Sequence, residues 1–326
     1  MATTNPMSVS SSSSTATTTA TDTGYQMVTA TPLLTPTELL VTVFAFITLG
    51  GDVGVLFVGL SLGYWFGPRL DETTRPAAAT TIAVAMLALA VVLAVKSYTA
   101  IPRPAAMPID PTVLPGGLAD FVGGELDSDG FSFPSGHATG STAVYGSLAV
   151  LLTVGRRRLR YLVAGVAIGL ISLSRVVIGV HYPRDIIAGM LLGTLLVAGG
   201  VKLARDGDRL RPDRVFVLAG VAASIGAVVA WQGGHTEEVR QGVIGIGTTL
   251  GALGVWHRVG ERLTDAPAVS LPVALAGIVV AGALWIGAYE GVFGLVGTVV
   301  GSAVGVTIIL WLPLVESWRR KKRDNQ

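Results

Sequence analysis

The stretches that decide the fold are KSYTAIPRP (residues 96–104), PSGH (residues 134–137) and SRVVIGVHYPRD (residues 174–185). Each lies at the end of a long apolar segment. Among their residues are the cations Lys96, Arg103 and Arg175, two histidines, Ser135 and a carboxylate, all at the ends of hydrophobic sequence. Ionisable groups near membrane-like segments are costly unless they pair or serve a function, so these stretches are the first candidates for a functional site.

The composition is that of an integral membrane protein. Of the 326 residues, 51% are hydrophobic and 13% are charged, about half of the ~25% charged residues in soluble domains. The apolar residues fall in long runs, as membrane-spanning segments do. The chain has no cysteine, which excludes disulfides, thiolate catalysis and cysteine-ligated metals. The net charge of +2 is too small to indicate nucleic acid as a partner.

The pattern along the chain predicts an all-α fold, a polytopic transmembrane helical bundle of about ten spans. Residues 1–35 are rich in Ser and Thr and predict a disordered tail. Thr35 and Glu38 then form a capping box, with Pro36 at the first helical position. Apolar segments follow at about 36–50, 53–67, 77–99, 137–154, 160–180, 184–203, 214–231, 240–256, 269–288 and 291–315.

We expect this bundle to have two parts. Residues 36–205 form a six-span core that carries all three polar stretches. Residues 206–318 add about four spans of unknown role, before a basic cytoplasmic tail at 319–326. The first two segments meet at residues 50–52, as either a tight hairpin or one long tilted helix. The Gly and Ala of the C-terminal part permit close helix packing, which fits either a scaffold or a homo-oligomer surface.

The distribution of Lys and Arg predicts the topology. With ten spans and both termini inside, 18 of the 23 basic residues lie on the cytoplasmic side, as the positive-inside rule requires. The five outside are Lys96, Arg103, Arg175, Arg184 and Arg240. The three polar stretches therefore share the non-cytoplasmic face of a cell-membrane protein. Merging the first two segments would move the N-terminus to the other side, but not these stretches.

The first and third stretches supply three cations, Lys96, Arg103 and Arg175. A guanidinium fork matches the charged oxygens of a phosphoryl group, and Lys adds a point charge. Snorkelling at the interface would explain one such residue. Three at the same face, beside two histidines, predict a site that binds a phosphoryl group and stabilises its charge during transfer.

The second stretch opens a helix. Ser135 is the expected N-cap, and the backbone amides of Gly136 and His137 then point out of the helix start, where anions bind. His137 would lie beside a bound phosphate and could protonate the leaving oxygen. On its own, this four-residue match fits equally well a capping turn with an incidental histidine.

The third stretch pairs a histidine with a carboxylate. Pro183 suits the first turn of a helix, so Asp185 lies in that turn and His181 just before it. Asp185 could fix one ring nitrogen and leave the other free as a nucleophile, with a phosphohistidine intermediate. A purely structural capping interaction is the alternative. The remaining histidines, His235 and His257, are expected in loops, solvated and without partners.

These three stretches resemble the signature of the phosphatidic acid phosphatase type 2 superfamily, Lys-x6-Arg-Pro, Pro-Ser-Gly-His and Ser-Arg-x5-His-x3-Asp. All spacings agree, and the resemblance covers about residues 36–205. It implies hydrolysis of a phosphomonoester or pyrophosphate without metal or other cofactor. It implies that His181 is the nucleophile, His137 the acid and Asp185 the orienting partner. The phosphate ligands that it implies are Lys96, Arg103, Ser135, Gly136 and Arg175.

The many spans favour the membrane lipid phosphate phosphatase branch of this superfamily over its soluble acid phosphatases. The expected substrate is a lipid phosphate or pyrophosphate, such as phosphatidic acid, phosphatidylglycerol phosphate or a polyprenyl phosphate. Two alternatives stay open: a transporter or flippase of a lipid-linked substrate, and a haloperoxidase that holds vanadate. The loop at about 105–133 is either a lid for an acyl or prenyl chain or a solvated connection.

Overall fold

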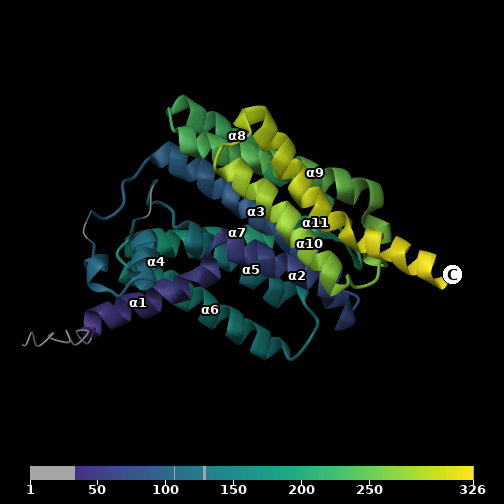
Figure 1. The fold of residues 1–326 in the computed structure, drawn as a ribbon, viewed down its shortest axis with the longest axis horizontal. Coiled ribbons are helices and arrows are strands. Elements are labelled where there is room, and N and C mark those ends of the chain that lie inside the picture. Colours follow the sequence, from purple (N-terminus) through teal and green to yellow (C-terminus); the bar gives the residue numbers. More distant parts are fainter. Residues whose placement is uncertain (1–33, 106, 128–129, 326) are drawn as a thin grey trace, which may run out of the picture. The chain divides into compact units, whose positions relative to one another are not determined.

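The computed structural model describes residues 34–105, 107–127 and 130–325, which form eleven α-helices, short 3-10 turns and one two-stranded hairpin (Figure 1). The tail expected at residues 1–35 lies almost entirely outside the described residues. The helices are α1 (Pro36–Thr48), α2 (Val53–Phe66), α3 (Thr74–Thr99), α4 (Gly117–Leu126), α5 (Gly136–Leu151), α6 (Arg157–Val177), α7 (Pro183–Ala204), α8 (Pro212–Gln232), α9 (Thr236–Thr264), α10 (Leu271–Tyr289) and α11 (Gly294–Asp324). The strands are β1 (Arg205–Asp206) and β2 (Arg209–Leu210), and the 3-10 turns are Leu49–Gly51, Gly67–Arg69 and Pro111–Val113.

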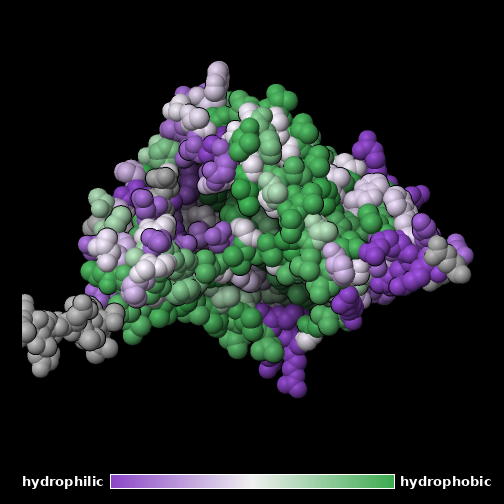
Figure 2. Space-filling model, in the orientation of Figure 1, coloured by the Kyte–Doolittle hydropathy of each residue, from purple (hydrophilic) through white to green (hydrophobic). Residues whose placement is uncertain are grey.

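The structure confirms an all-α membrane-type fold but not the count of ten spans. Among the described residues, six helices are long and apolar enough to cross a bilayer: α3, α6, α7, α8, α10 and α11. The helices α1 and α2 pass the same test only as a pair, bent by 48°. This bend is far from the chain reversal of a tight hairpin and fits either a broken span or a re-entrant segment. Figure 2 shows hydrophobic residues across the middle of the visible face and hydrophilic residues toward its ends.

The helix starts follow the local signals of the sequence. Thr35 and Glu38 form the expected capping box at α1. The break before α2 occurs at Asp52, whose side chain accepts a hydrogen bond from the Gly54 amide at 3.0 Å and so restarts the helix. The helix α4, within the loop between the first two polar stretches, was not expected. Its Phe121 stacks on Phe46 of α1 with ring centroids 4.6 Å apart.

The helix α3 is the centre of the bundle, and its buried face is rich in alanine. It packs against α2, α5, α7, α8 and α9, so the C-terminal helices belong to the same compact unit, which begins at Thr35. Buried Arg75 of α3 joins the parts further, because it donates hydrogen bonds to the carbonyls of Leu263 at 2.9 Å and Pro267 at 2.9 Å. The boundary expected near residue 205 stays a prediction.

Two glycines of α7 bring this helix close to α5. A Cβ at Gly189 would lie 2.8 Å from the Ser135 carbonyl oxygen, and one at Gly193 would lie 2.9 Å from that of Thr139. Real side chains do not tolerate such distances. The close approach sets the start of α7, with Asp185, beside the start of α5, with Ser135.

Candidate active site

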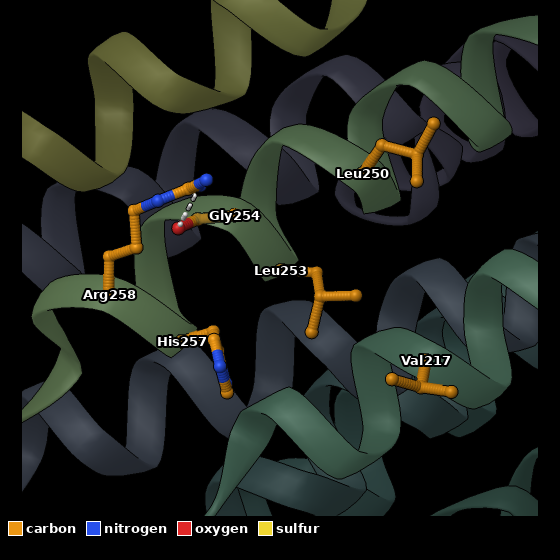
Figure 3. A pocket seen from close by; sticks show the side chains of 6 residues that line it. All are labelled: Val217, Leu250, Leu253, Gly254, His257 and Arg258. Atoms are coloured by element: carbon orange, nitrogen blue, oxygen red, sulfur yellow. Dashed lines mark hydrogen bonds between the residues drawn. The ribbon is translucent and has the colours of Figure 1, made fainter.

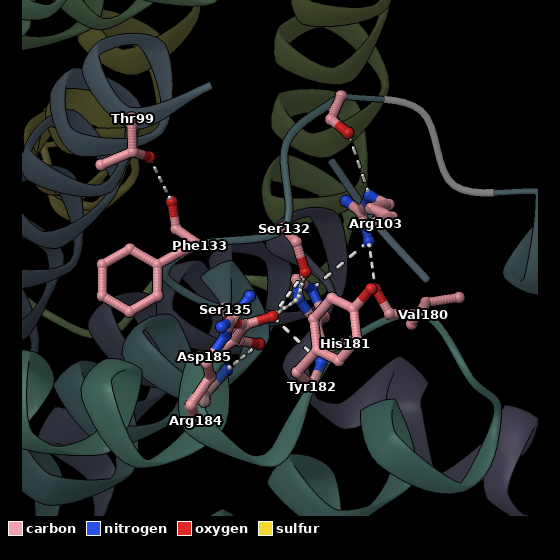
Figure 4. A network of polar contacts seen from close by, with 12 residues as sticks. Thr99, Arg103, Ser132, Phe133, Ser135, Val180, His181, Tyr182, Arg184 and Asp185 are labelled. Atoms are coloured by element: carbon pink, nitrogen blue, oxygen red, sulfur yellow. Dashed lines mark hydrogen bonds and ion pairs between the residues drawn. The ribbon is translucent and has the colours of Figure 1, made fainter. Parts of the chain in front are cut away.

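The three polar stretches meet at one end of α3, α5, α6 and α7, joined by backbone hydrogen bonds (Figure 4). The Ser132 amide, two residues before the second stretch, donates to the Ile101 carbonyl of the first stretch at 2.8 Å. The Ser135 amide donates to the Asp185 carbonyl at 3.1 Å, which ties the second stretch to the third. Residues more than 80 positions apart in the sequence therefore share one small volume.

Arg103 reaches His181 across this volume. Its Nη1 lies 3.3 Å from His181 Nε2 and donates to the Val180 carbonyl at 3.3 Å. Its Nε donates to the Gly130 carbonyl at 3.3 Å. The first and third stretches thus bring a guanidinium and an imidazole nitrogen within contact distance, as a phosphate site with a histidine nucleophile requires.

Arg175, in the last turn of α6, is almost completely buried and contacts side chains from two other elements. Its Nη1 donates to Thr48 Oγ1 at 2.8 Å and forms an ion pair with Glu125 Oε2 at 3.2 Å. Thr48 ends α1 and Glu125 lies in α4. The bend region and the loop helix, neither of which the motifs include, therefore contribute to the surroundings of this cation.

Lys96 and His137 complete the group. Lys96 lies half-buried in the last turn of α3 and interacts electrostatically with Arg103 and Arg175. His137 is the second residue of α5 and interacts electrostatically with the same three cations. A Cβ at Gly51 would lie 3.0 Å from the His137 ring, so the bend after α1 approaches this side chain closely.

The start of α5 has the expected cap. Ser135 is fully buried, and its side chain accepts a hydrogen bond from the Ala138 amide at 3.4 Å. Gly136 and His137 are the first two residues of the helix, where amides lack partners within the helix. The hydroxyl of Ser135 is thus engaged with the helix start, next to a region where an anion would be favoured.

His181 and Asp185 approach one another as expected, but a third residue lies between them. His181 Nδ1 is 3.6 Å from Asp185 Oδ2, which also accepts a hydrogen bond from the Tyr182 amide at 3.0 Å. The Ser132 hydroxyl donates to the same Oδ2 at 2.5 Å and lies 3.2 Å from His181 Nδ1. All three side chains are buried (Figure 4).

Electrostatics favour a neutral His181. Burial lowers its pKa well below the usual value, and the nearby guanidinium of Arg103 lowers it further. A neutral imidazole is the form that can act as a nucleophile. Burial instead raises the pKa of the Glu125 carboxyl, and its ion pair with Arg175 opposes that shift.

The sequence interpretation missed Ser132, Thr48 and Glu125. Ser132 lies two residues before the PSGH stretch, and no spacing rule singles it out. Glu125 is one of several acidic residues in its loop, so only the helix α4 and its packing on α1 distinguish it. Neither Ser132 nor Glu125 could be identified as part of the site without knowledge of the tertiary contacts.

The other two histidines differ from expectation. His235 is the residue before α9, and its ring packs edge-on against Phe131 with centroids 4.6 Å apart. His257 lies inside α9 and faces a pocket between α8 and α9 (Figure 3). The predicted loop position is therefore confirmed for His235 and wrong for His257, and the expectation that His235 has no partner was wrong. That pocket is lined by Val217, Leu250, Leu253, Gly254, His257 and Arg258, none of which belongs to the polar stretches.

Comparison with known families agrees with this geometry. Residues 77–209 match the family model of the PAP2 superfamily, and this segment contains all three polar stretches. This segment, which is less than half of the chain, is thus similar to the PAP2 superfamily. No solved structure matches the chain.

This chain is similar to three curated relatives that are named as lipid phosphatases. It is 39% identical over 72 residues to phosphatidylglycerophosphatase B of Bacillus subtilis, which covers 20% of this chain and 36% of the relative. It is 40% identical over 88 residues to lipid A 1-phosphatase of Rhizobium johnstonii, covering 25% and 33%. It is 35% identical over 77 residues to undecaprenyl-diphosphatase of Sulfolobus acidocaldarius, covering 24% and 35%. The matched segments span about a third of each relative.

Proposed function

We propose that this protein is a membrane phosphatase that hydrolyses a lipid phosphate or pyrophosphate through a phosphohistidine intermediate. The observation that carries the proposal is the contact of Arg103 with His181 Nε2 at 3.3 Å. It sets a phosphate-binding cation beside the ring nitrogen that faces away from Asp185. The match to the PAP2 superfamily and the names of the curated relatives support the same reaction class.

In the proposed first step, Nε2 of neutral His181 attacks the phosphorus, and the bond from phosphorus to the leaving oxygen breaks. His137 gives its proton to that oxygen. In the second step, water attacks the phosphorus, its proton goes to His137, and the bond from phosphorus to Nε2 breaks. Free phosphate leaves, and His181 returns to the neutral form.

The phosphoryl oxygens are held by Lys96, Arg103 and Arg175, with the amides at the start of α5. Because these groups already supply positive charge where negative charge develops, the reaction needs no divalent metal. In this structure the carboxylate of Glu125 forms an ion pair with Arg175 at 3.2 Å. A phosphate at this site would compete with that carboxylate for the guanidinium.

The proposed active site faces the non-cytoplasmic side of the membrane. The 48° bend supports one broken crossing for α1 and α2. With α5 and α9 added to the six long apolar helices, the chain then crosses nine times rather than ten. The start of α1 shares the side of the active site, and the basic end of α11 is cytoplasmic. The ten-span arrangement changes only the side of α1.

The test is release of phosphate from a panel of substrates, in detergent with a chelator. The panel contains phosphatidic acid, phosphatidylglycerophosphate, a lipid A 1-phosphate, undecaprenyl diphosphate and a soluble phosphate ester. We expect hydrolysis of at least one lipid substrate and its loss in His181→Ala. Absence of hydrolysis across the panel, or activity that survives His181→Ala, would contradict the proposal.

A further inference from the structure

Ser132 occupies an unusual position for a residue outside the three motifs. Its side chain is fully buried, and its backbone amide is fixed on the Ile101 carbonyl at 2.8 Å. Its hydroxyl lies within 3.2 Å of His181 Nδ1 and 2.5 Å of Asp185 Oδ2. Backbone and side chain together hold this oxygen between the two residues of the proposed nucleophile pair (Figure 4).

The proton on His181 can be assigned from its neighbours. A guanidinium only donates hydrogen bonds, so Nε2, at 3.3 Å from Arg103 Nη1, is the acceptor. A neutral imidazole that accepts at Nε2 carries its proton on Nδ1. The Nδ1–H therefore points toward Ser132 and Asp185, and the Nε2 lone pair points toward the phosphate-binding cations.

The direction of the next hydrogen bond follows from Asp185. A carboxylate only accepts, so the Ser132 hydroxyl donates to Oδ2. A lone pair on the same hydroxyl oxygen remains to accept from His181 Nδ1–H. The direct distance from Nδ1 to Oδ2 is 3.6 Å, beyond the usual range of a hydrogen bond between nitrogen and oxygen.

We infer that Ser132 is a positioning residue that links His181 to Asp185 by a hydrogen-bonded chain from Nδ1–H through Oγ–H to the carboxylate. This inference rests on the proposed function, because it gives the chain a role in phosphoryl transfer. When Nε2 bonds to phosphorus, the ring becomes a cation and keeps its proton on Nδ1. The carboxylate then stabilises that charge through the hydroxyl, and no proton has to leave Nδ1.

Without the hydroxyl, the ring loses its hydrogen-bond acceptor and the carboxylate loses a donor. The imidazole is then free to rotate or to change tautomer, and the Nε2 lone pair is no longer aimed at phosphorus. Phosphate binding should change little, because the cations and the helix start are untouched. The hydrogen-bonded chain of Ser132 therefore affects turnover rather than substrate affinity.

The test compares Ser132→Ala and Ser132→Cys with the wild type on the best lipid substrate. We expect kcat to fall about 10- to 100-fold in Ser132→Ala, the range for loss of a buried hydrogen-bond partner. KM and the inhibition constant of inorganic phosphate should stay within about twofold. Cysteine fills similar space but is a weak donor, so Ser132→Cys should also be slow. A Cys variant with wild-type kcat would reduce Ser132 to a space-filling role and overturn the inference.

A matched control is Ser141→Ala. Ser141 is also fully buried, but its hydroxyl donates to the Ala138 carbonyl of its own helix at 3.3 Å. This variant should keep its kcat. An equal loss in both variants would mean that any buried serine of this region matters, which contradicts a specific role for Ser132.

A double variant tests whether Ser132 acts through Asp185. In an Asp185→Ala background, Ser132→Ala should cost less than about threefold, because the side-chain acceptor at the end of the hydrogen-bonded chain is already gone. Two fully multiplied losses would overturn the link. If the wild type hydrolyses none of the substrates, the proposed function fails instead. The same two substitutions must then show coupled effects on thermal stability, and independent effects would overturn the hydrogen-bonded chain itself.

Discussion

Replacing Asp185 by asparagine removes a charge while keeping most of the local geometry. Asp185 is completely buried, and its Oδ2 accepts from the Tyr182 amide and the Ser132 hydroxyl. The side-chain carbonyl of asparagine can accept the same two hydrogen bonds. What the variant loses is the negative charge 3.6 Å from His181 Nδ1, which opposes the positive charge on the ring during phosphoryl transfer.

The distance sets the size of the effect. Two unit charges at 3.6 Å interact by about 4–5 kcal/mol at an effective dielectric constant of about 20. Losing all of this energy in the transition state would lower the rate by about three powers of ten, and losing half of the energy would lower it about 50-fold. We therefore expect Asp185→Asn to lower kcat between about 50- and 1000-fold, with KM changed less than about threefold.

The assay is steady-state phosphate release in detergent, with thermal unfolding as a check on folding. Asp120→Asn serves as the control, because Asp120 is exposed on α4 and should have no effect on kcat. A folded Asp185→Asn protein with kcat within about threefold of the wild type would refute the electrostatic role of this carboxylate.

Three further predictions test the membrane arrangement, the chemistry and the protonation of the site. Since the chain has no cysteine, single cysteines at Asp127 and Lys321 can be labelled in intact cells, and only the former should react from outside; equal reaction would overturn the topology. Hydrolysis should survive EDTA and be inhibited by vanadate, whose five-coordinate form resembles the transition state, whereas activity that EDTA abolishes and magnesium restores would exclude the metal-free reaction. Because the pKa of His181 is lowered by burial, the unfolded chain takes up a proton below about pH 6.5 that the folded protein refuses. Folded-state stability should therefore fall as pH drops below about 6.5, and His181→Gln should reduce this slope by up to about 1.4 kcal/mol per pH unit; identical slopes would contradict a buried neutral ring.

Local sequence signals were enough to locate the helices that carry the site. Ser135 caps α5, Pro183 opens α7 and Asp185 lies in the first turn of α7, as their positions in the sequence predicted. These features depend on backbone groups within a few residues, so a short stretch contains all the information needed. The positive-inside pattern and the motif spacing then indicated a shared face for the three stretches.

Features that depend on tertiary contacts could not be predicted from the sequence. The bend at Leu49–Gly51 follows a continuous apolar run, which fits a straight helix, a kink or a hairpin equally well. Glu125 and Ser132 gain their roles from partners about 50 positions away, Arg175 and His181. Hydrophobic periodicity carries no information about such pairs.

The most direct test of the central claim is to trap the phosphorylated enzyme. His137→Ala would be mixed with labelled p-nitrophenyl phosphate or a labelled lipid phosphate, quenched in alkaline detergent and mapped. The good leaving group of p-nitrophenyl phosphate lets the first step proceed without an acid, whereas the second step still lacks its base. The account predicts label on His181, and none in a His181→Ala protein. Label on another residue, or continued turnover by His181→Ala, would contradict it.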